Sequence, residues 1–161
     1  VYKRQNYHIT LRMKTESGFS TEEAEKERNE MIRPPVRCRI MVVDDMKTNL
    51  QMLRGILEPL YDVILMKSGH QALLYLKKHP APDLVLMDIQ MPRMDGYTAT
   101  REIRTLPNNR KANVPIVAMT ANAFDEDRKK AFECGMNGHI VKPIDRRSIS
   151  KVLDQIFKEA K

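Results

Sequence analysis

The stretch LVLMDIQMPRMDG, residues 84–96, decides the fold of this chain. Its first four residues are apolar without alternation, which is typical of a parallel strand that helices cover on both faces. The run ends on a carboxylate, Asp88, and the chain then turns at Met91 and Pro92. A negative charge at the end of an apolar strand suggests that this charge has a functional role at that edge of the sheet.

Short apolar runs of the same kind recur along the chain, separated by amphipathic segments of helix length. We expect strands at residues 40–43, 63–66, 84–87, 116–119 and 140–141, and helices at 48–60, 70–78, 96–105, 125–134 and 145–158. These strand-helix units predict a doubly wound α/β fold around a five-stranded parallel sheet. In such sheets, ligands bind at the carboxyl ends of the strands, where the strand order switches direction.

The first 36 residues differ in character from the rest. Residues 7–13 alternate apolar and polar side chains, the pattern of a strand with one buried face. Residues 15–35 are polar and charged, with a candidate short helix at 22–31. We therefore predict an N-terminal extension over residues 1–36, made of a strand and a linker, followed by one globular domain over residues 37–161.

Composition and charge argue against several classes of protein. No apolar run approaches the roughly 20 residues of a membrane span, and the N-terminus lacks the apolar core of a signal peptide, so we expect a cytoplasmic protein without membrane contact. Cys38 and Cys134 lie far apart without a CxxC motif, so we expect neither a disulfide nor a zinc site. The formal charge is +7, but the basic residues are spread over the expected helices, so we expect no nucleic-acid binding.

Polar residues follow four of the expected strands. Asp44 and Asp45 follow the first strand, Asp88 the third, Thr120 the fourth and Lys142 the fifth. Taken singly, each has an ordinary explanation as a helix cap, a turn residue, a strand residue or a surface charge. Taken together, they converge, because parallel strands end at the same edge of the sheet.

This convergence predicts a chemistry. Three neighbouring carboxylates would repel one another and raise one another's pKa, so a positive charge should lie among them. An anionic cluster of oxygens suits a hard cation such as Mg²⁺, which takes a few carboxylates plus phosphate oxygens. Lys142 adds a second positive charge, Thr120 a hydroxyl, and the small Ala121 leaves room, which is the arrangement that phosphoryl transfer needs.

The motifs MVVDD, LVLMDIQMPRMDG, IVAMTA and HIVKPID closely resemble those of the response-regulator receiver family, over about residues 38–158. The resemblance implies a flavodoxin-like strand order of 2-1-3-4-5 and makes Asp88 the phosphoacceptor for a phosphohistidine. It implies that Asp44 and Asp45 hold Mg²⁺ together with Asp88 and the backbone carbonyl of Gln90. It further implies that Thr120 and Lys142 bind the phosphoryl oxygens.

Other positions follow from the same resemblance. The bond between Lys142 and Pro143 is expected to be cis. His139 stands where the family usually has Tyr or Phe, so the usual inward swing of an aromatic ring is not assured in this chain. Gln90 and Asn122 occupy the two variable positions that, in the family, tune the attack of water on the acyl phosphate.

The sequence around these motifs resembles the C-terminal receiver of a hybrid sensor histidine kinase. A histidine kinase or a histidine phosphotransfer domain is then the expected partner, and phosphorylation could drive homodimerisation. The receiver would catalyse its own phosphorylation and dephosphorylation, while no kinase catalytic site lies in this segment. A stand-alone response regulator remains the main alternative.

A phosphatase or flavin carrier on the same fold is disfavoured. Gln90 stands where a dehalogenase-like phosphatase needs Asp, and a flavodoxin phosphate loop would not carry Asp44 and Asp45.

Overall fold

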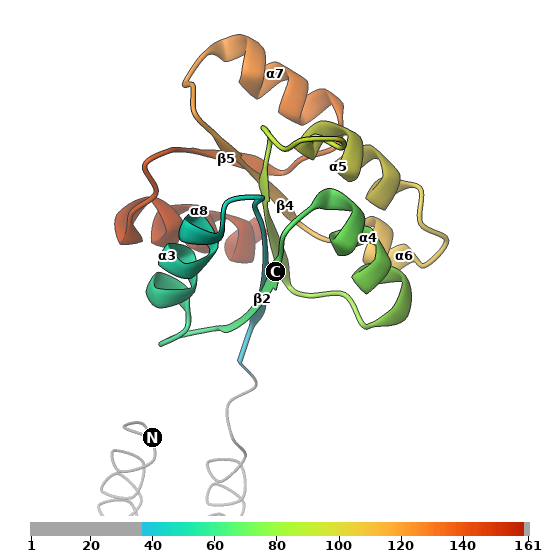
Figure 1. The fold of residues 1–161 in the computed structure, drawn as a ribbon, viewed down its shortest axis with the longest axis horizontal. Coiled ribbons are helices and arrows are strands. Elements are labelled where there is room, and N and C mark those ends of the chain that lie inside the picture. Colours follow the sequence, from blue (N-terminus) through green and yellow to red (C-terminus); the bar gives the residue numbers. More distant parts are fainter. Residues whose placement is uncertain (1–36, 160–161) are drawn as a thin grey trace, which may run out of the picture. The chain divides into compact units, whose positions relative to one another are not determined.

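A computed structural model describes residues 37–159 of the chain. The strand expected at residues 7–13 and the charged segment that follows it lie outside the described residues. Within the described part, the elements alternate between strands and helices along the sequence (Figure 1).

The strands form one parallel five-stranded sheet in the order β2-β1-β3-β4-β5. Their bounds are β1 (Arg39–Val43), β2 (Asp62–Met66), β3 (Leu84–Asp88), β4 (Ile116–Thr120) and β5 (Gly138–Val141). The chain first moves outward from β1 to β2 and then returns to place β3 on the other side of β1, with Val43 beside Met87. The predicted fold and strand order are therefore confirmed, and the switch point lies between β1 and β3.

Helices cover both faces of the sheet. On one face lie α3 (Lys47–Leu57) and α8 (Arg146–Glu159), and on the other lie α4 (Gly69–Lys78), α5 (Gly96–Arg104) and α7 (Asp125–Glu133) (Figure 1). The helix expected to run to residue 60 ends at Leu57 instead. Glu58 still has helical dihedral angles, but Pro59 has no backbone N–H with which to continue the hydrogen bonds of the helix, so the helix ends here. A four-residue helix, α6 (Asn109–Ala112), was not predicted.

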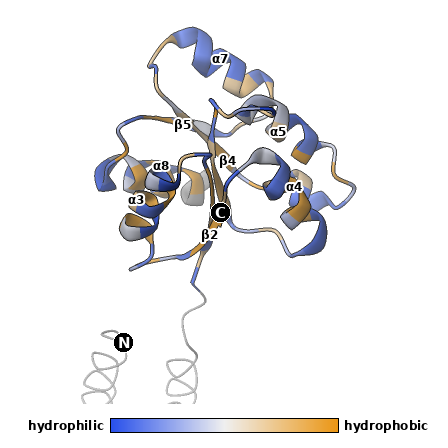
Figure 2. Cartoon of the chain, viewed as in Figure 1, coloured by the Kyte–Doolittle hydropathy of each residue, from blue (hydrophilic) through white to orange (hydrophobic). Residues whose placement is uncertain are grey.

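Two hydrophobic cores stabilise this arrangement, one on each face of the sheet. Side chains of β3 alternate between them, with Val85 and Met87 in one core and Leu84 and Leu86 in the other. All of these side chains have no exposed surface, and each such burial stabilises the fold by roughly 1.5–3 kcal/mol. Figure 2 shows apolar residues along the strands and polar residues on the outer sides of the helices.

Arg104 at the end of α5 joins several connecting segments on the side of the molecule away from the carboxyl ends of the strands. Its guanidinium donates to the carbonyl oxygens of Ala112, Val114 and Gly135 and to the Asn137 side chain, at 2.7–2.9 Å. Burial lowers the pKa of this guanidinium, and no described carboxylate pairs with it. The neutral carbonyls therefore take the place of an ion pair.

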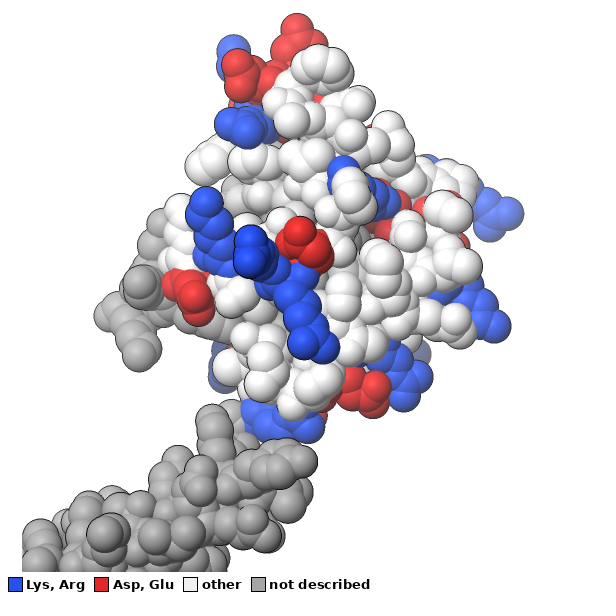
Figure 3. Space-filling view, turned by 90° about the vertical axis from the view of Figure 1, so that its left-hand side faces the viewer, with Lys and Arg blue, Asp and Glu red and all other residues white. Residues whose placement is uncertain are grey.

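Charged side chains are mixed on the face covered by α3 and α8. Figure 3 shows several Lys and Arg side chains close together there, with acidic side chains beside them and large uncharged areas around them. No helix among the described residues is both long and apolar enough to cross a membrane.

Candidate functional site

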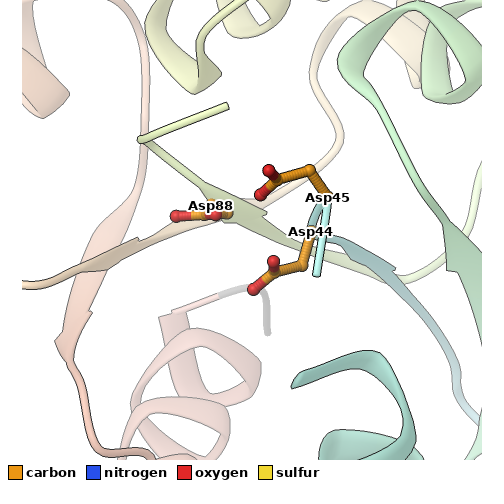
Figure 4. A group of neighbouring side chains, drawn as sticks. All are labelled: Asp44, Asp45 and Asp88. Carbon is orange, nitrogen blue, oxygen red and sulfur yellow. The ribbon is translucent and has the colours of Figure 1, made fainter. Parts of the chain in front are cut away.

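Three carboxylates meet at the switch point of the sheet. Asp44 follows β1 and is fully buried, Asp88 ends β3 and is 3% exposed, and Asp45 is exposed. One oxygen from each lies within 4.8 Å of the others, and the three side chains face a common space (Figure 4). The predicted convergence of these residues is thus present in the structure.

Lys142 brings a positive charge to this cluster from the loop after β5. Its Nζ lies 3.2 Å from Asp88 Oδ1 and 3.5 Å from Asp44 Oδ2. The ammonium therefore bridges the two buried carboxylates, which lowers the cost of holding both charges in the interior. The Lys142-Pro143 peptide bond is cis, as the resemblance implied.

Asp88 has two differently engaged carboxylate oxygens. Oδ1 accepts from the Gln90 backbone N–H and from Lys142, both at 3.2 Å. None of the described residues donates a hydrogen bond to Oδ2. Burial raises the pKa of Asp88, the charge of Asp44 raises it further, and Lys142 acts against both. The carboxyl is thus a partly compensated buried charge with one oxygen still available.

The backbone around Asp88 is fixed by a close approach of the chain to itself. The Gly96 N–H donates to the Ile89 carbonyl at 3.0 Å, and the Asp95 side chain caps α5 by accepting from the Thr98 N–H at 2.7 Å. A Cβ at Gly96 would lie 2.9 Å from the Ile89 Cα and still closer to the Asp88 carbonyl oxygen. Only glycine fits here without moving the end of β3.

The end of β4 lies beside this cluster, since Met119 pairs in register with Asp88 and Thr120 is the last residue of the strand. Thr120 is 6% exposed, and its Oγ1 donates to the Asn122 carbonyl and accepts from the Asn122 N–H, at 2.9 and 3.1 Å. The Lys142 N–H donates to the Thr120 carbonyl at 2.7 Å, which joins the loop after β5 to the end of β4. The Thr120 hydroxyl is therefore engaged by its own loop and does not contact the carboxylates.

His139 lies outside the acidic cluster. It is half-buried on β5, where it pairs in register with Ala118 of β4. Burial lowers the pKa of its imidazole, and the nearby charge of Arg128 on α7 lowers it further. In the described residues, no hydrogen bond or ion pair joins His139 to the carboxylates.

A cavity of about 380 Å³ opens beside the cluster and adds a residue that the sequence analysis did not single out. Its lining includes Asp44 and Lys142 together with Asn49, which lies in the first turn of α3. The Asn49 side-chain amide donates to Asp44 Oδ2 at 3.2 Å. Its position one turn after the acidic pair was a signal in the sequence, but an amide in a polar helix start has too many ordinary explanations to stand out.

The fold and the site together define a class of protein. It is a doubly wound α/β protein whose switch point carries a bridging ammonium and three carboxylates of the kind that suits a hard cation, one of which is buried with an available oxygen. The chain belongs to the response regulator receiver domain family, which matches residues 40–154.

Several curated relatives are sensor kinases. The chain is 36% identical over 126 residues to the sensor protein GacS of Pseudomonas syringae pv. syringae, covering 76% of this chain and 14% of that protein. It is 39% identical over 115 residues to the signal transduction histidine-protein kinase BarA of Escherichia coli, covering 71% of this chain and 12% of that protein. The chain therefore spans only about one seventh or less of the length of these relatives.

Solved structures of receiver domains are also similar. One is the receiver domain of a sensor histidine kinase from Pseudomonas aeruginosa, described as having a magnesium ion coordinated in its active-site cleft. It has a TM-score of 0.66 and 36% sequence identity, covering 74% of this chain and 97% of that chain. A receiver domain of a histidine kinase from Syntrophus aciditrophicus has a TM-score of 0.67 and 28% identity, covering 77% and 92%.

Proposed function

We propose that this chain is the phosphoacceptor receiver of a phosphorelay and that Asp88 is the residue that takes the phosphoryl group from a phosphohistidine. The observation that carries the proposal is the state of the Asp88 carboxylate. It is buried at the carboxyl end of β3, Lys142 and the Gln90 N–H hold its Oδ1, and its Oδ2 is left for a new bond.

The proposed transfer is a displacement at phosphorus. An Asp88 oxygen forms the new O–P bond as the N–P bond of the donor breaks, and the electron pair of that bond stays on the imidazole nitrogen. Negative charge on the transferred group is then stabilised by the Lys142 ammonium, which already lies within 3.2 Å of the acceptor carboxylate. For Thr120 to donate to a phosphoryl oxygen, its hydroxyl must release the Asn122 carbonyl.

Mg²⁺ is the proposed cofactor. Asp44, Asp45 and Asp88 supply hard oxygen ligands within 4.8 Å of one another, and the exposed Asp45 leaves the cluster open to water and substrate. The Gln90 backbone carbonyl is the proposed fourth protein ligand. When bound, the ion would neutralise the carboxylates and the incoming phosphate oxygens, which the one ammonium of Lys142 cannot do alone.

The proposed partners follow from the relatives. Both GacS and BarA carry names of sensor or histidine-protein kinases, and the chain matches a short portion of each. We therefore infer that the chain is the receiver of a hybrid histidine kinase, with a kinase or a histidine phosphotransfer domain as its partner. Residues 1–36 are proposed to be the extension that precedes the receiver domain, and homodimerisation on phosphorylation remains part of the proposal.

The test is phosphorylation of the purified chain with acetyl phosphate, read by intact mass spectrometry. We expect one added phosphoryl group with Mg²⁺ and none with excess EDTA. Asp88→Asn should abolish the addition. Asp95→Asn is the matched control, because Asp95 is an exposed carboxylate seven residues away whose helix cap Asn can also form.

Two outcomes would contradict the proposal. One is labelling of Asp88→Asn to the extent seen in the unsubstituted chain. The other is loss of labelling in Asp95→Asn equal to that in Asp88→Asn with both proteins folded, since this would make the effect a general one of charge near the loop.

A further inference from the structure

Asp44 is the most deeply buried ligand candidate, and each of its oxygens has a defined donor. Oδ1 accepts from the Met46 N–H at 2.9 Å, and Oδ2 lies 3.2 Å from the Asn49 amide and 3.5 Å from Lys142 Nζ. The Met46 N–H and the Asn49 side chain both belong to the start of α3. The orientation of this carboxylate is therefore set largely by one helix terminus.

The two donors to Asp44 Oδ2 differ in whether another negatively charged group competes for them. Lys142 is shared, and its Nζ is closer to Asp88 Oδ1 than to Asp44 Oδ2. A phosphoryl group on Asp88 would bring new negative oxygens to the side of the ammonium. The Asn49 amide has no such competing charge, and it is the remaining side-chain donor to Oδ2 within the described part of the chain.

We propose that Asn49 is a positioning residue that keeps the Asp44 carboxylate oriented as a metal ligand, above all when Lys142 turns to a phosphoryl oxygen. The inference rests on the proposed function: its first half rests on the proposed Mg²⁺ site of the unphosphorylated chain, and its second half on phosphorylation of Asp88. The chemistry of the side chain fits the role. An amide donates a hydrogen bond without adding charge, whereas a carboxylate would repel Asp44 and an ammonium would compete with the cation.

The cavity beside Asp44 shows which neighbours a different side chain at position 49 would meet. Asn49 and Asp44 both line the space of about 380 Å³, together with Leu53 and Met52 of the same helix. A leucine at position 49 has the same branched shape and the same number of side-chain heavy atoms as asparagine, and its larger methyl groups find apolar neighbours in the cavity, so it can keep packing there without the hydrogen bond. This separates the proposed role from a contribution to packing.

The experiment measures Mg²⁺ affinity of the full chain by isothermal titration calorimetry, with no phosphodonor present. Partners that orient metal-ligating carboxylates are worth about 10-fold or more in affinity, so Asn49→Ala and Asn49→Leu should each raise the Kd for Mg²⁺ about 10-fold. Gln51→Ala is the matched control, since Gln51 is an exposed amide on α3 outside the site, and its Kd should stay within about 2-fold.

A second measurement probes the competition with Lys142. In a Lys142→Met background, Asn49 is left as the side-chain donor to Asp44 Oδ2, so adding Asn49→Leu should raise the Kd by a larger factor than it does in the unsubstituted chain. An equal or smaller rise in the Kd would overturn the proposal that Asn49 holds Asp44 Oδ2 when Lys142 does not.

The outcomes are distinguishable from those of the phosphorylation test. An unchanged Kd in a folded Asn49→Leu protein would overturn the role of Asn49, while Asp88 could still be the phosphoacceptor. Conversely, labelling of Asp88→Asn would remove the proposed function, while a weakened Mg²⁺ affinity of Asn49→Leu would still support the orienting role. Should Asn49→Ala fail to fold, the shape-matched Asn49→Leu decides alone.

Discussion

The position of Asp88 suits the phosphoacceptor role proposed for it, but it is a costly position for a charged side chain. Its burial and the neighbouring Asp44 charge raise its pKa, so the folded protein holds this proton more tightly than the unfolded chain does. Stability therefore falls as the pH rises from the ordinary aspartate value through the raised pKa of the folded state.

The corresponding prediction concerns metal-free protein. In EDTA at pH 7, Asp88→Asn should raise the free energy of unfolding by about 1 kcal/mol, because it removes one of two neighbouring buried carboxylates. The gain should disappear below about pH 3, under the ordinary aspartate value of 3.8, where the carboxyl is protonated in both states. Urea unfolding at several pH values measures both. A variant less stable than the unsubstituted chain at pH 7 would show that the ion pair with Lys142 outweighs the repulsion.

His139 gives a pH dependence of the opposite direction. Burial first, and Arg128 second, lower its pKa in the folded state, so protonation is easier in the unfolded chain. Its contribution to stability is complete above the ordinary histidine value of 6.5 and is lost as the pH falls below that value towards the lowered pKa.

An NMR titration tests this cause. We expect Arg128→Gln to raise the pKa of the His139 imidazole, because it removes a nearby positive charge, although desolvation should keep the pKa below that of an exposed histidine. Lys129→Gln, an exposed neighbour on α7, is the control and should move the pKa less. An equal shift in both variants would mean that the net charge of the helix, and not Arg128 itself, acts on the ring.

At the scale of elements, the junction of β3 and α5 fixes the position of Asp88. Gly96→Ala would push a methyl group against the Asp88 carbonyl and the Ile89 Cα, so we expect a loss of at least about 2 kcal/mol and weaker Mg²⁺ binding. Gly55→Ala on α3 is the matched control. A Cβ there meets no atom within 4 Å, and the change should stabilise the protein by about 1 kcal/mol. Thermal unfolding with and without Mg²⁺ measures the two effects, and a stable, Mg²⁺-binding Gly96→Ala protein would contradict this account of the junction.

The sequence was sufficient to predict the strands that are strongly apolar, and insufficient where the backbone alone defines an element. β3 and β4 differ from the prediction by one residue at one end. β5 begins at Gly138, two residues before the apolar run, because Gly138 joins the sheet by pairing with Val117 and has no side chain that marks a strand. The short α6 has no apolar period, and its only side-chain signal is the Asn108 cap.

The candidate site was predictable for a related reason. Parallel strands deliver the residues that follow them to one edge, so Asp44, Asp88 and Lys142 could be grouped without any knowledge of distances. What the pattern could not supply was orientation. The hydroxyl of Thr120 is turned to Asn122, and Asn49 donates to Asp44 from a helix. Neither contact could be predicted, because each depends on individual hydrogen bonds that produce no periodic pattern in the sequence.

At the scale of the whole molecule, Arg104 joins segments that are distant in the sequence. Arg104→Met keeps much of the side-chain volume but leaves several carbonyl oxygens without their donor, so we expect a loss of about 3 kcal/mol. Arg101→Met, an exposed arginine on the same helix, should change stability by no more than about 0.5 kcal/mol. Chemical denaturation measures the difference, and similar values for both variants would mean that solvent replaces the guanidinium at little cost.

The distance along the chain between the site's charges has a consequence for how the protein is made. Asp44 and Lys142 are 98 residues apart, and Lys142 reaches the carboxylates only after β5 has paired with β4. During synthesis, the carboxylates therefore emerge from the ribosome long before the cation that compensates them. A nascent chain that ends before residue 142 would carry an acidic cluster without its ammonium, so the site is completed only once the last strand is in place.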